Sequence, residues 1–466
     1  MCRPFFSIAV QTAALLLVSG CGDDTPPSPD AQADSSVEAG VDAGADGSMD
    51  AMGPDIPDAE WRDLSLRTQW GSEESLEVVT QGIFAIWWDP RFDHAEDAPV
   101  MFAQLESIRR ECLDELGMAD PPNPAAGYYY NVYIHHGEDD DFPNGWANGQ
   151  GTDEFGMPFL TLPNGAHIDR GNIYHEGFHI FQYEATSPGF AYRGDSQWYI
   201  ESTAQWFMAK HLPLAEDAYV EAGAISGNPQ LALWHSFSNE APGDPTDWLF
   251  QVRQYGMHTY LVYLSESAGI DPAIITRGFY EGVSVSPQRY QYDAVGGDRL
   301  RGFFADWAAH NTADFDYLTR DQVARARREV EVVADAANLH PFVAEWRDAG
   351  SSADGFRPEA SLSPRGWSYN VVRIQTTQPA TYSVTFEGDA TGSEGAASYF
   401  ESRLVAISPG GARYLALSMA DSVSGAGSIS VVAGETDLYV VVAAVPEHFS
   451  GNQTYGYSLQ VSRVES

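Results

Sequence analysis

The chain has 466 residues, of which 44% are hydrophobic, and a formal net charge of −41 at pH 7. This length is sufficient for two domains with hydrophobic cores. The excess of negative charge argues against a nucleic-acid partner and against adhesion to anionic lipid, because both surfaces would repel the protein.

Residues 1–21 resemble a bacterial lipoprotein signal peptide. Arg3 supplies the positive charge, residues 5–18 form an apolar segment, and Ser19 and Gly20 precede Cys21. The resemblance implies cleavage before Cys21 and lipidation of that cysteine. We therefore expect an extracytoplasmic protein that a lipid anchors to a bacterial membrane, at the cell surface or in the periplasm. No later apolar run is long enough to span a membrane.

Residues 22–60 consist mostly of Asp, Ala, Gly, Ser and Pro and contain no Lys or Arg. A segment of this composition cannot bury enough apolar surface to fold, and its like charges repel one another. We predict a disordered acidic tether over these residues.

Residues 61–350 are expected to form the first folded domain. It begins with a β-rich run at 77–88, a helix at 99–116 and a strand at 128–135. The helix places Cys112 on its apolar side, so we expect a buried thiol. The other two cysteines belong to the signal peptide, so no intramolecular disulfide is expected.

An acidic run at 138–141 is followed by Asn144, Asn148 and Asp153. Their oxygen atoms are ligands that Ca²⁺ accepts, but the spacing of an EF-hand loop is absent. In a chain this acidic, a solvated loop is the better interpretation, and a Ca²⁺ site is the alternative.

The segment His175-Glu176-Gly177-Phe178-His179 is an HExxH motif. Residues four apart lie on the same face of an α-helix, so both imidazoles can bind one Zn²⁺ ion, with Glu176 beside them as a general base. The flanking sequence is typical of a helix: Asp169 and Asn172 are candidate N-caps, and Ser-Pro-Gly at 187–189 ends it.

A catalytic zinc ion normally has three protein ligands and one open position. Glu201 is the best candidate for the third ligand, because it lies 22 residues after the motif on a second predicted helix. Asp195, at the start of that helix, and Glu184, on the continuing first helix, are the alternatives. Gln182 and Ala185 stand where metzincins have Gly and His, which excludes that class.

Trp198, Glu201 and Ala204 form a W-x-x-E-x-x-A pattern. Together with HExxH, this pattern resembles the gluzincin metallopeptidases, in which the downstream Glu is the third zinc ligand. The resemblance implies one catalytic Zn²⁺ ion bound by His175, His179 and Glu201, with Glu176 as the general base.

Some gluzincins carry an Asp one turn after the third ligand to orient a zinc-bound His, but this chain has Gln205 there. An amide oxygen can accept the imidazole N–H, although it increases the basicity of the ligand less than a carboxylate does.

Transition-state stabilisation needs a hydrogen-bond donor directed at the oxyanion. A helix predicted over about 248–266 carries Tyr255 and His258 one turn apart. Gluzincins place a Tyr or His in this role on an element after the Glu helix, so Tyr255 is the first candidate and His258 the second. The alternative for an aromatic residue at helical spacing is packing.

A short strand precedes the zinc helix and contains Phe159, Leu160 and Thr161. In gluzincins an edge strand at this place pairs with the extended peptide substrate, so the resemblance implies that these residues bind substrate.

Helical patterns continue to about residue 346 and include 301–310 and 322–337. Residues 351–466 instead show short β runs separated by Gly, Pro and Ser, at 369–375, 381–387, 403–408, 413–419, 428–432, 437–445 and 455–461. Seven strands at this spacing predict a β-sandwich. The expected fold is an α+β zincin-like catalytic domain followed by an all-β sandwich domain.

The whole layout also resembles a family of uncharacterised exported proteins. These carry HExxH, W-x-x-E-x-x-A, a Tyr-Gly pair on a later helix and a G-W-x-x-N pattern before the sandwich. The last two are matched by Tyr255-Gly256 and by residues 366–370. The sandwich also resembles the accessory domains that follow secreted bacterial peptidases.

These patterns predict a monomeric surface lipoprotein that hydrolyses peptide or protein substrates with zinc. One alternative is a non-catalytic surface protein that binds glycan or protein through the sandwich and holds an inert or structural zinc ion. Another is hydrolysis of a bond other than the peptide bond. A structural zinc ion is normally closed by four protein ligands, and only three are identified, which favours catalysis.

Overall fold

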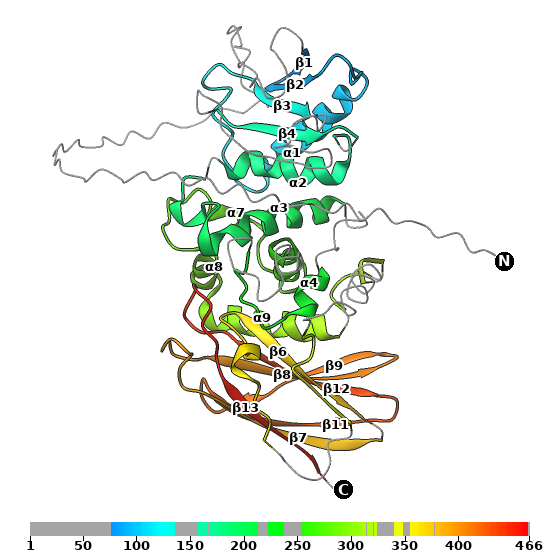
Figure 1. The fold of residues 1–466 in the computed structure, drawn as a ribbon, viewed down its shortest axis with the longest axis vertical. Helices are drawn as coiled ribbons and strands as arrows, with labels where there is room; N and C mark the ends of the chain where they lie inside the picture. Colours follow the sequence, from blue (N-terminus) through cyan, green and yellow to red (C-terminus); the bar gives the residue numbers. More distant parts are fainter. Residues whose placement is uncertain are drawn as a thin grey trace, which may run out of the picture.

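The computed structural model describes most of the folded part of the chain, namely residues 76–135, 157–165, 167–183, 185–212, 222–236, 253–313, 315–319, 321–323, 340–347, 355–376 and 378–464. The expected signal peptide, tether and Ca²⁺ loop lie outside the described residues. Within the described ranges, no helix is long and apolar enough to cross a membrane. A small sheet, a helical middle and a β-rich part with two further sheets follow one another along the longest axis (Figure 1).

The small sheet has the strand order β1-β2-β3-β4. β1 (Glu77–Gln81) pairs antiparallel with β2 (Phe84–Trp88), and β3 (Tyr130–His135) and β4 (Phe159–Pro163) extend the sheet in parallel. Gly82, with φ of +57°, adopts the left-handed conformation that the tight turn between β1 and β2 requires. β1 is exposed along its whole length, whereas every residue of β2 and β4 is buried.

Two helices pack beside this sheet, α1 (Ala98–Asp114) and α2 (Arg170–Gln182). α1 begins with Pro99, where proline fits the first turn, and is followed by Gly117 in the left-handed conformation. It buries Leu105, Ile108 and Cys112, so the expected buried thiol is confirmed. α2 packs against both α1 and β4.

The helical middle begins with α3 (Gln197–His211), which packs on α2. Four shorter helices follow among the described residues, α4 (Ala222–Gly227), α6 (His258–Val262), α7 (Ala273–Arg277) and α8 (Pro287–Val295), and then the longer α9 (Gly297–Thr312). The helix predicted over 248–266 is interrupted, because a turn at Met257 separates residues 253–256 from α6 and a π-helical turn, Tyr263–Ser267, follows.

The β-rich part forms two sheets. One has the order β5-β6-β12-β8-β9 and the other β10-β11-β7-β13. The strands are β5 (Ala344–Arg347), β6 (Ser368–Gln375), β7 (Ala380–Gly388), β8 (Phe400–Ser408), β9 (Gly411–Ala416), β10 (Ser418–Met419), β11 (Ser424–Val431), β12 (Asp437–Ala444) and β13 (Tyr457–Val464). Side chains from both sheets form one core between them, the packing of a sandwich.

One expectation about this region is wrong. Helical patterns were expected to continue to about residue 346, but residues 344–347 form β5, which pairs in parallel with β6. The run around Trp346 is too short for its hydrophobic periodicity to distinguish a helix from an edge strand. The pairing with β6 decides that it is a strand. The predicted boundary at 350 therefore separates β5 from its own sheet.

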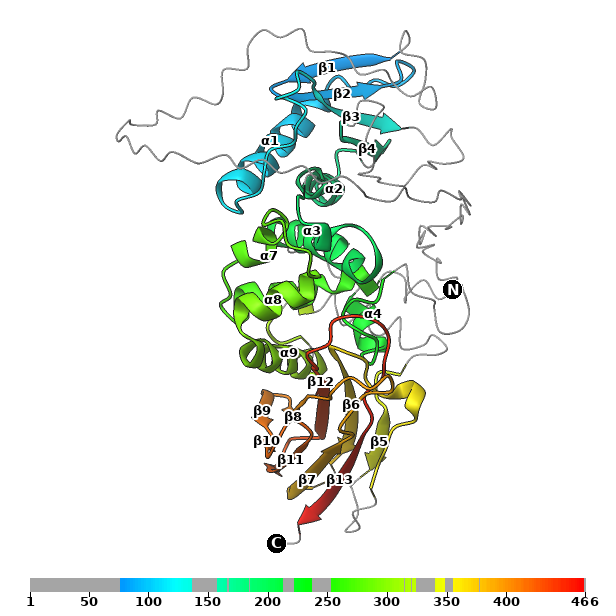
Figure 2. The ribbon, with the colours of Figure 1, turned by 90° about the vertical axis from the view of Figure 1, so that its left-hand side faces the viewer.

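The outer face of the five-stranded sheet is covered by α9 (Figure 2). Phe304 and Trp307 of α9 meet Trp367 and Tyr369 in edge-on ring contacts. β12 is therefore buried on both faces, in agreement with its continuous apolar run from Leu438 to Ala444. The expectation of mixed α and β structure with a β-rich C-terminal part is confirmed.

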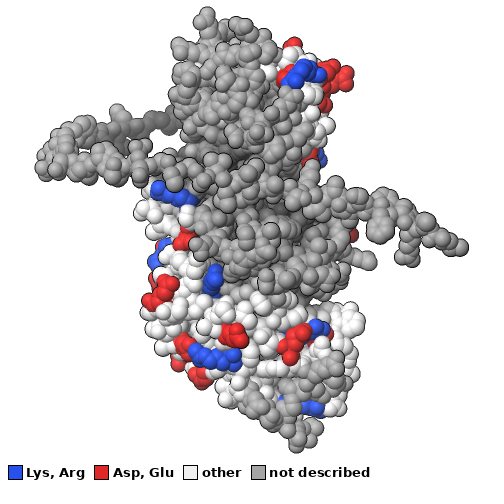
Figure 3. Space-filling view, viewed as in Figure 1, with Lys and Arg blue, Asp and Glu red and all other residues white. Residues whose placement is uncertain are grey.

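Charges on the described surface are interspersed. On the face shown in Figure 3, Lys and Arg side chains lie among Asp and Glu side chains. Among the described residues, Arg289 is paired with both Asp293 and Glu447. The described part of this face therefore presents no continuous basic patch.

Candidate metal centre

The candidate centre lies between α2 and α3, and the local sequence explains where α2 begins. Asp169 is the N-cap residue, and its carboxylate accepts a hydrogen bond from the Gly171 N–H at 2.7 Å. Asn172, the other candidate cap, lies inside the helix. This start places His175 and His179 one turn apart in the buried middle of α2.

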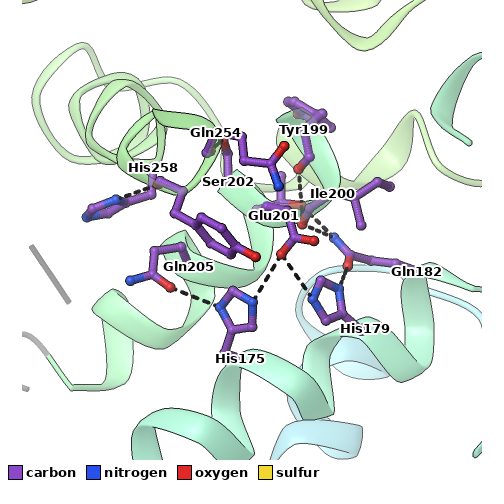
Figure 4. A network of polar contacts seen from close by, with 12 residues as sticks. His175, His179, Gln182, Tyr199, Ile200, Glu201, Ser202, Gln205, Gln254 and His258 are labelled. Atoms are coloured by element: carbon purple, nitrogen blue, oxygen red, sulfur yellow. Dashed lines mark hydrogen bonds and ion pairs between the residues drawn. The ribbon is translucent and has the colours of Figure 1, made fainter. Parts of the chain in front are cut away.

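Three side chains from the two helices converge at one point (Figure 4). Oε2 of Glu201 lies 3.3 Å from Nε2 of His175 and 3.5 Å from Nε2 of His179. The two imidazole rings are 4.9 Å apart and nearly perpendicular. All three residues are buried, with His175 the most exposed at 9%. The sequence prediction that Glu201 would join both histidines agrees with this geometry.

These distances suit a metal ion. In a tetrahedral site with bonds of about 2.0–2.2 Å, neighbouring ligand atoms lie about 3.3 Å apart. The observed separations of 3.3 and 3.5 Å are close to that value. His175, His179 and Glu201 can therefore hold a metal ion.

Gln182 orients His179 from outside the ligand group. Its Oε1 lies 2.5 Å from Nδ1 of His179, while its Nε2 donates to the Ile200 carbonyl and the Thr203 hydroxyl. The Thr203 hydroxyl donates in turn to the Tyr199 carbonyl, so it accepts from Gln182. This chain of donors fixes the orientation of the amide, directs its oxygen at Nδ1 of His179, and leaves Nε2 of His179 facing Glu201.

Gln205 orients His175 in the same way. Gln205 lies one helical turn after Glu201 on α3. Its Oε1 lies 2.9 Å from Nδ1 of His175 (Figure 4). Gln205 thus lies in contact with His175, one of the histidines that its position in the sequence predicted. Both ligand histidines are thus held by neutral amides rather than by carboxylates.

The electrostatics of the group favour ionised Glu201. Burial by itself raises the pKa of Glu201, but hydrogen bonds from His175 and His179 outweigh burial and hold that pKa well below its usual range. Burial lowers the pKa of His179, but the hydrogen bond to Glu201 and the charges of Glu201 and Glu176 raise it to about 9. Without metal, His179 thus keeps a proton that metal binding must displace.

The remaining predicted catalytic residues differ in their placement. Glu176 is buried on α2, and its charge acts on His179. The Tyr255 ring lies 5.8 Å from that of His175, between centroids. His258 turns away from the three ligands (Figure 4), and its Nδ1 lies 2.9 Å from the Tyr255 carbonyl. Burial lowers the pKa of His258 to about 4, so it supports the backbone at Tyr255 as a neutral side chain.

The backbone that carries Tyr255 is anchored at several points. The Ser202 hydroxyl, next to Glu201 on α3, donates to the Gln254 carbonyl at 2.5 Å. The buried guanidinium of Arg253 donates to the carbonyls of Ala224 and Leu231. Tyr255 is therefore held at a defined position relative to α3.

Two tyrosines near the centre were missed by the sequence reasoning. Tyr192 hydrogen bonds to Glu201, with Gln197 and Gln254 as further partners, and 38% of the residue remains exposed. Tyr183 follows α2, and within the described ranges its buried hydroxyl has no hydrogen-bond partner. Burial raises the pKa of both hydroxyls, so both carry their protons. Tyr192 could have been identified from the sequence, because it is an aromatic residue with a hydroxyl group in the short segment between His179 and Glu201.

The candidates for substrate binding and the alternative metal ligands lie outside the His-His-Glu group or outside the described residues. Phe159, Leu160 and Thr161 lie in β4, the last strand in the order of the small sheet, and their side chains are buried. Any contact of β4 with a substrate would thus use its backbone. Asp195 accepts a hydrogen bond from Gly451 N–H and is not part of the ligand group, and Glu184 lies outside the described residues.

The fold and the centre together define a mixed α/β protein with a buried His-His-Glu group able to hold a metal ion. The sequence model of a family of unknown function, DUF6055, matches residues 84–459. The chain belongs to this family. Among curated proteins, none matches the chain.

Similarity to solved structures is distant. The pre-peptidase C-terminal domain of a collagenase from Bacillus anthracis is 12% identical, with 27% of this chain and all of that chain covered and a TM-score of 0.18. A family GH115 4-O-methyl-α-glucuronidase is 12% identical over 76% of this chain and 54% of its own, with a TM-score of 0.16. A β-glucosidase from Paenibacillus barengoltzii is 11% identical over 40% of this chain and 20% of its own, with a TM-score of 0.12.

Proposed function

We propose that the protein is a zinc-dependent hydrolase of gluzincin type that cleaves peptide bonds in peptide or protein substrates. The observation that carries this proposal is the convergence of His175, His179 and Glu201, with Glu176 beside them on the same helix. Two imidazoles and one carboxylate are the ligand set of many catalytic zinc sites, and three protein ligands leave a position for water or substrate. Bound there, zinc would act as a Lewis acid on the scissile carbonyl and acidify a coordinated water molecule.

The residues of the chain supply the proton transfers. In the proposed reaction, Glu176 accepts a proton from the attacking water and delivers it to the leaving amine. The Tyr255 hydroxyl donates a hydrogen bond to the oxyanion as charge develops on the former carbonyl oxygen. Tyr192, which already donates to Glu201, holds that ligand in place. Lipidation at Cys21 and a monomeric state belong to the same proposal.

The central test is Glu176→Gln, which removes the proton acceptor but preserves the shape of the side chain. We expect the variant to retain one equivalent of zinc at the centre and to lose hydrolysis of a denatured casein substrate, measured by release of new amino termini. His211→Gln, which changes a histidine elsewhere that is paired with Glu111, is the matched control.

Two results would contradict the proposal. Unchanged turnover by the Glu176→Gln variant would remove the assigned base. Zinc bound at full occupancy by the unaltered chain, with no cleavage across a broad peptide library, would instead favour a non-catalytic binding protein or a hydrolase acting on another bond.

A second prediction separates the two tyrosines. Tyr255→Phe is expected to lower kcat by about 10²–10³-fold with unchanged zinc affinity, because only the transition state uses its hydroxyl. Tyr192→Phe is expected to weaken zinc binding, because it removes the hydrogen bond that the Tyr192 hydroxyl donates to Glu201. Kinetics and a zinc competition assay on both variants check this assignment. If Tyr192→Phe instead lowered kcat and Tyr255→Phe weakened zinc binding, the roles assigned to the two tyrosines would be exchanged.

A further inference from the structure

A second group of metal-ligating side chains lies at the carboxyl edge of the small sheet. His94 and Asp97 belong to the turn between β2 and α1, and His167 belongs to the loop between β4 and α2. β2 and β4 both run parallel to β3, so their carboxyl ends lie at the same edge of the sheet and bring the two loops together.

The three side chains meet at one carboxylate oxygen. Oδ2 of Asp97 lies 3.1 Å from Nδ1 of His94 and 2.9 Å from Nε2 of His167. The two imidazole rings are 4.3 Å apart at 68°. Both histidines are buried, at 6% and 4% exposure, whereas 30% of the Asp97 side chain remains exposed.

Asp97 faces the two imidazoles, and a neighbouring group contacts each imidazole ring. Asp97 is the N-cap residue of α1, yet its carboxylate caps no backbone N–H of the helix and faces the imidazoles instead. The His94 ring packs edge-on against Trp88. The Gly165 N–H donates a hydrogen bond to Nδ1 of the His167 ring at 3.3 Å.

We propose that His94, Asp97 and His167 form a second metal site, which binds a divalent transition-metal ion of the Zn²⁺ class. Two imidazoles and one carboxylate form a ligand set that suits Zn²⁺ and its first-row neighbours. The separations of 2.9 and 3.1 Å need to open only slightly to reach the ligand spacing of about 3.3 Å in a tetrahedral site. Because Asp97 is partly exposed, its side chain can make this movement, and water can complete the coordination.

The arrangement differs from an ordinary pair of a histidine with a carboxylate. His211 with Glu111 and His310 with Asp316 each join one imidazole to one carboxylate. Across the described part of the chain, only two groups bring three ligand atoms together, this one and the centre between α2 and α3.

A metal ion at this position would tie the start of α1 to the start of α2. α2 begins two residues after His167 at its N-cap Asp169, and it carries His175 and His179. The second site would therefore stabilise the helix that supplies two ligands of the first centre.

The test measures zinc stoichiometry of the purified full chain by equilibrium dialysis and metal analysis. We expect two equivalents for the unaltered chain and one for Asp97→Asn. The asparagine keeps an oxygen that both imidazoles can use, so the variant should fold, but it loses the charged ligand. Asp316→Asn, which alters a carboxylate paired with a single histidine, is the matched control and should keep two equivalents.

A further variant separates the two sites. His175→Ala/His179→Ala should retain one equivalent and show a zinc-dependent rise in melting temperature, and this rise should vanish when Asp97→Asn is added. If Asp97→Asn fails to fold, His94→Gln takes its place. The proposal would be overturned if the unaltered chain bound one equivalent of zinc and the His175→Ala/His179→Ala variant bound none. It would also be overturned if Asp97→Asn still bound two equivalents of zinc. Loss of hydrolysis alone would bear on the first centre only.

Discussion

Two glutamines hold the imidazoles of the first centre. Carboxylates commonly do this work at zinc sites and increase the basicity of the metal ligands. Gln182 and Gln205 provide the orientation without the charge, and both are buried, at 4% exposure. The ligand group itself contains only one carboxylate, Glu201, so its total negative charge stays low.

Gln205→Ala is predicted to lower zinc affinity at the first centre by about 10–100-fold, because His175 loses the acceptor that fixes its tautomer. Gln205→Glu should restore the affinity or exceed that of the unaltered chain. Competition with a chromogenic chelator measures both.

Gln322→Ala is the control for this prediction, because Gln322 is also a buried glutamine but accepts from the Thr319 N–H. Its zinc affinity should not change. Equal affinities for Gln205→Ala and the unaltered chain would show that the amide does not orient His175.

At the scale of the elements, the turn between α2 and α3 determines where Glu201 lies. The Ser196 hydroxyl, at the start of α3, donates to the Gly189 carbonyl at 2.7 Å. The N–H of Gly189 donates in turn to the Val283 carbonyl at 3.1 Å. The turn is thus fastened to the segment before α8 on one side and to α3 on the other.

Gly189→Ala is predicted to destabilise the protein by about 1–3 kcal/mol, since the added methyl group would overlap neighbouring backbone atoms. A Cβ atom at Gly189 would lie 1.9 Å from the backbone oxygen of Val285, so the turn must shift. Through Ser196 the shift would reach α3 and weaken zinc binding at Glu201 as well. Chemical denaturation and a zinc titration test both effects.

Gly355→Ala is the matched control, because a Cβ atom there meets nothing within 4 Å. Its stability should stay within about 0.5 kcal/mol of the unaltered chain. A Gly189→Ala protein as stable as this control would show that the turn can move without strain.

At the scale of the whole molecule, the β-rich part and the helical middle share a core. Trp307 of α9 is fully buried and contacts Tyr260 from the helical middle and Tyr369 from β6. Arg403 of β8 donates to Asp306 of α9 at 2.6 Å, across the same interface. An accessory domain joined by a linker would have neither contact, so the two parts should unfold together.

Trp307→Ala is predicted to cost about 3–5 kcal/mol. Because the tryptophan touches both parts, the variant should lower one common transition, seen by calorimetry and by circular dichroism. Leu415→Ala, at a residue that is 41% exposed, is the control and should leave the transition nearly unchanged. Two separate transitions, of which Trp307→Ala shifts only one, would contradict a shared core.

The first centre was largely predictable because it depends on local geometry. A spacing of four residues places His175 and His179 on one face of α2, and Glu201 lies at the distance that a return helix needs. Gln182 was used only to exclude the metzincin pattern, although it orients His179. Its acceptor role depends on Ile200 and Thr203, which lie on the other helix, and no period in the sequence reports that contact.

The sequence by itself predicts the HExxH helix, Glu201 as the candidate third ligand and most strands, because helical and strand periods are properties of neighbouring residues. Tertiary structure alone decided that Asp97 and His167, 70 residues apart, share one oxygen. It also decided that β5 joins β6 and that α9 covers the sheet. These contacts arise where parallel strands end together and where two apolar faces exclude water, and both conditions depend on the packing of the whole chain.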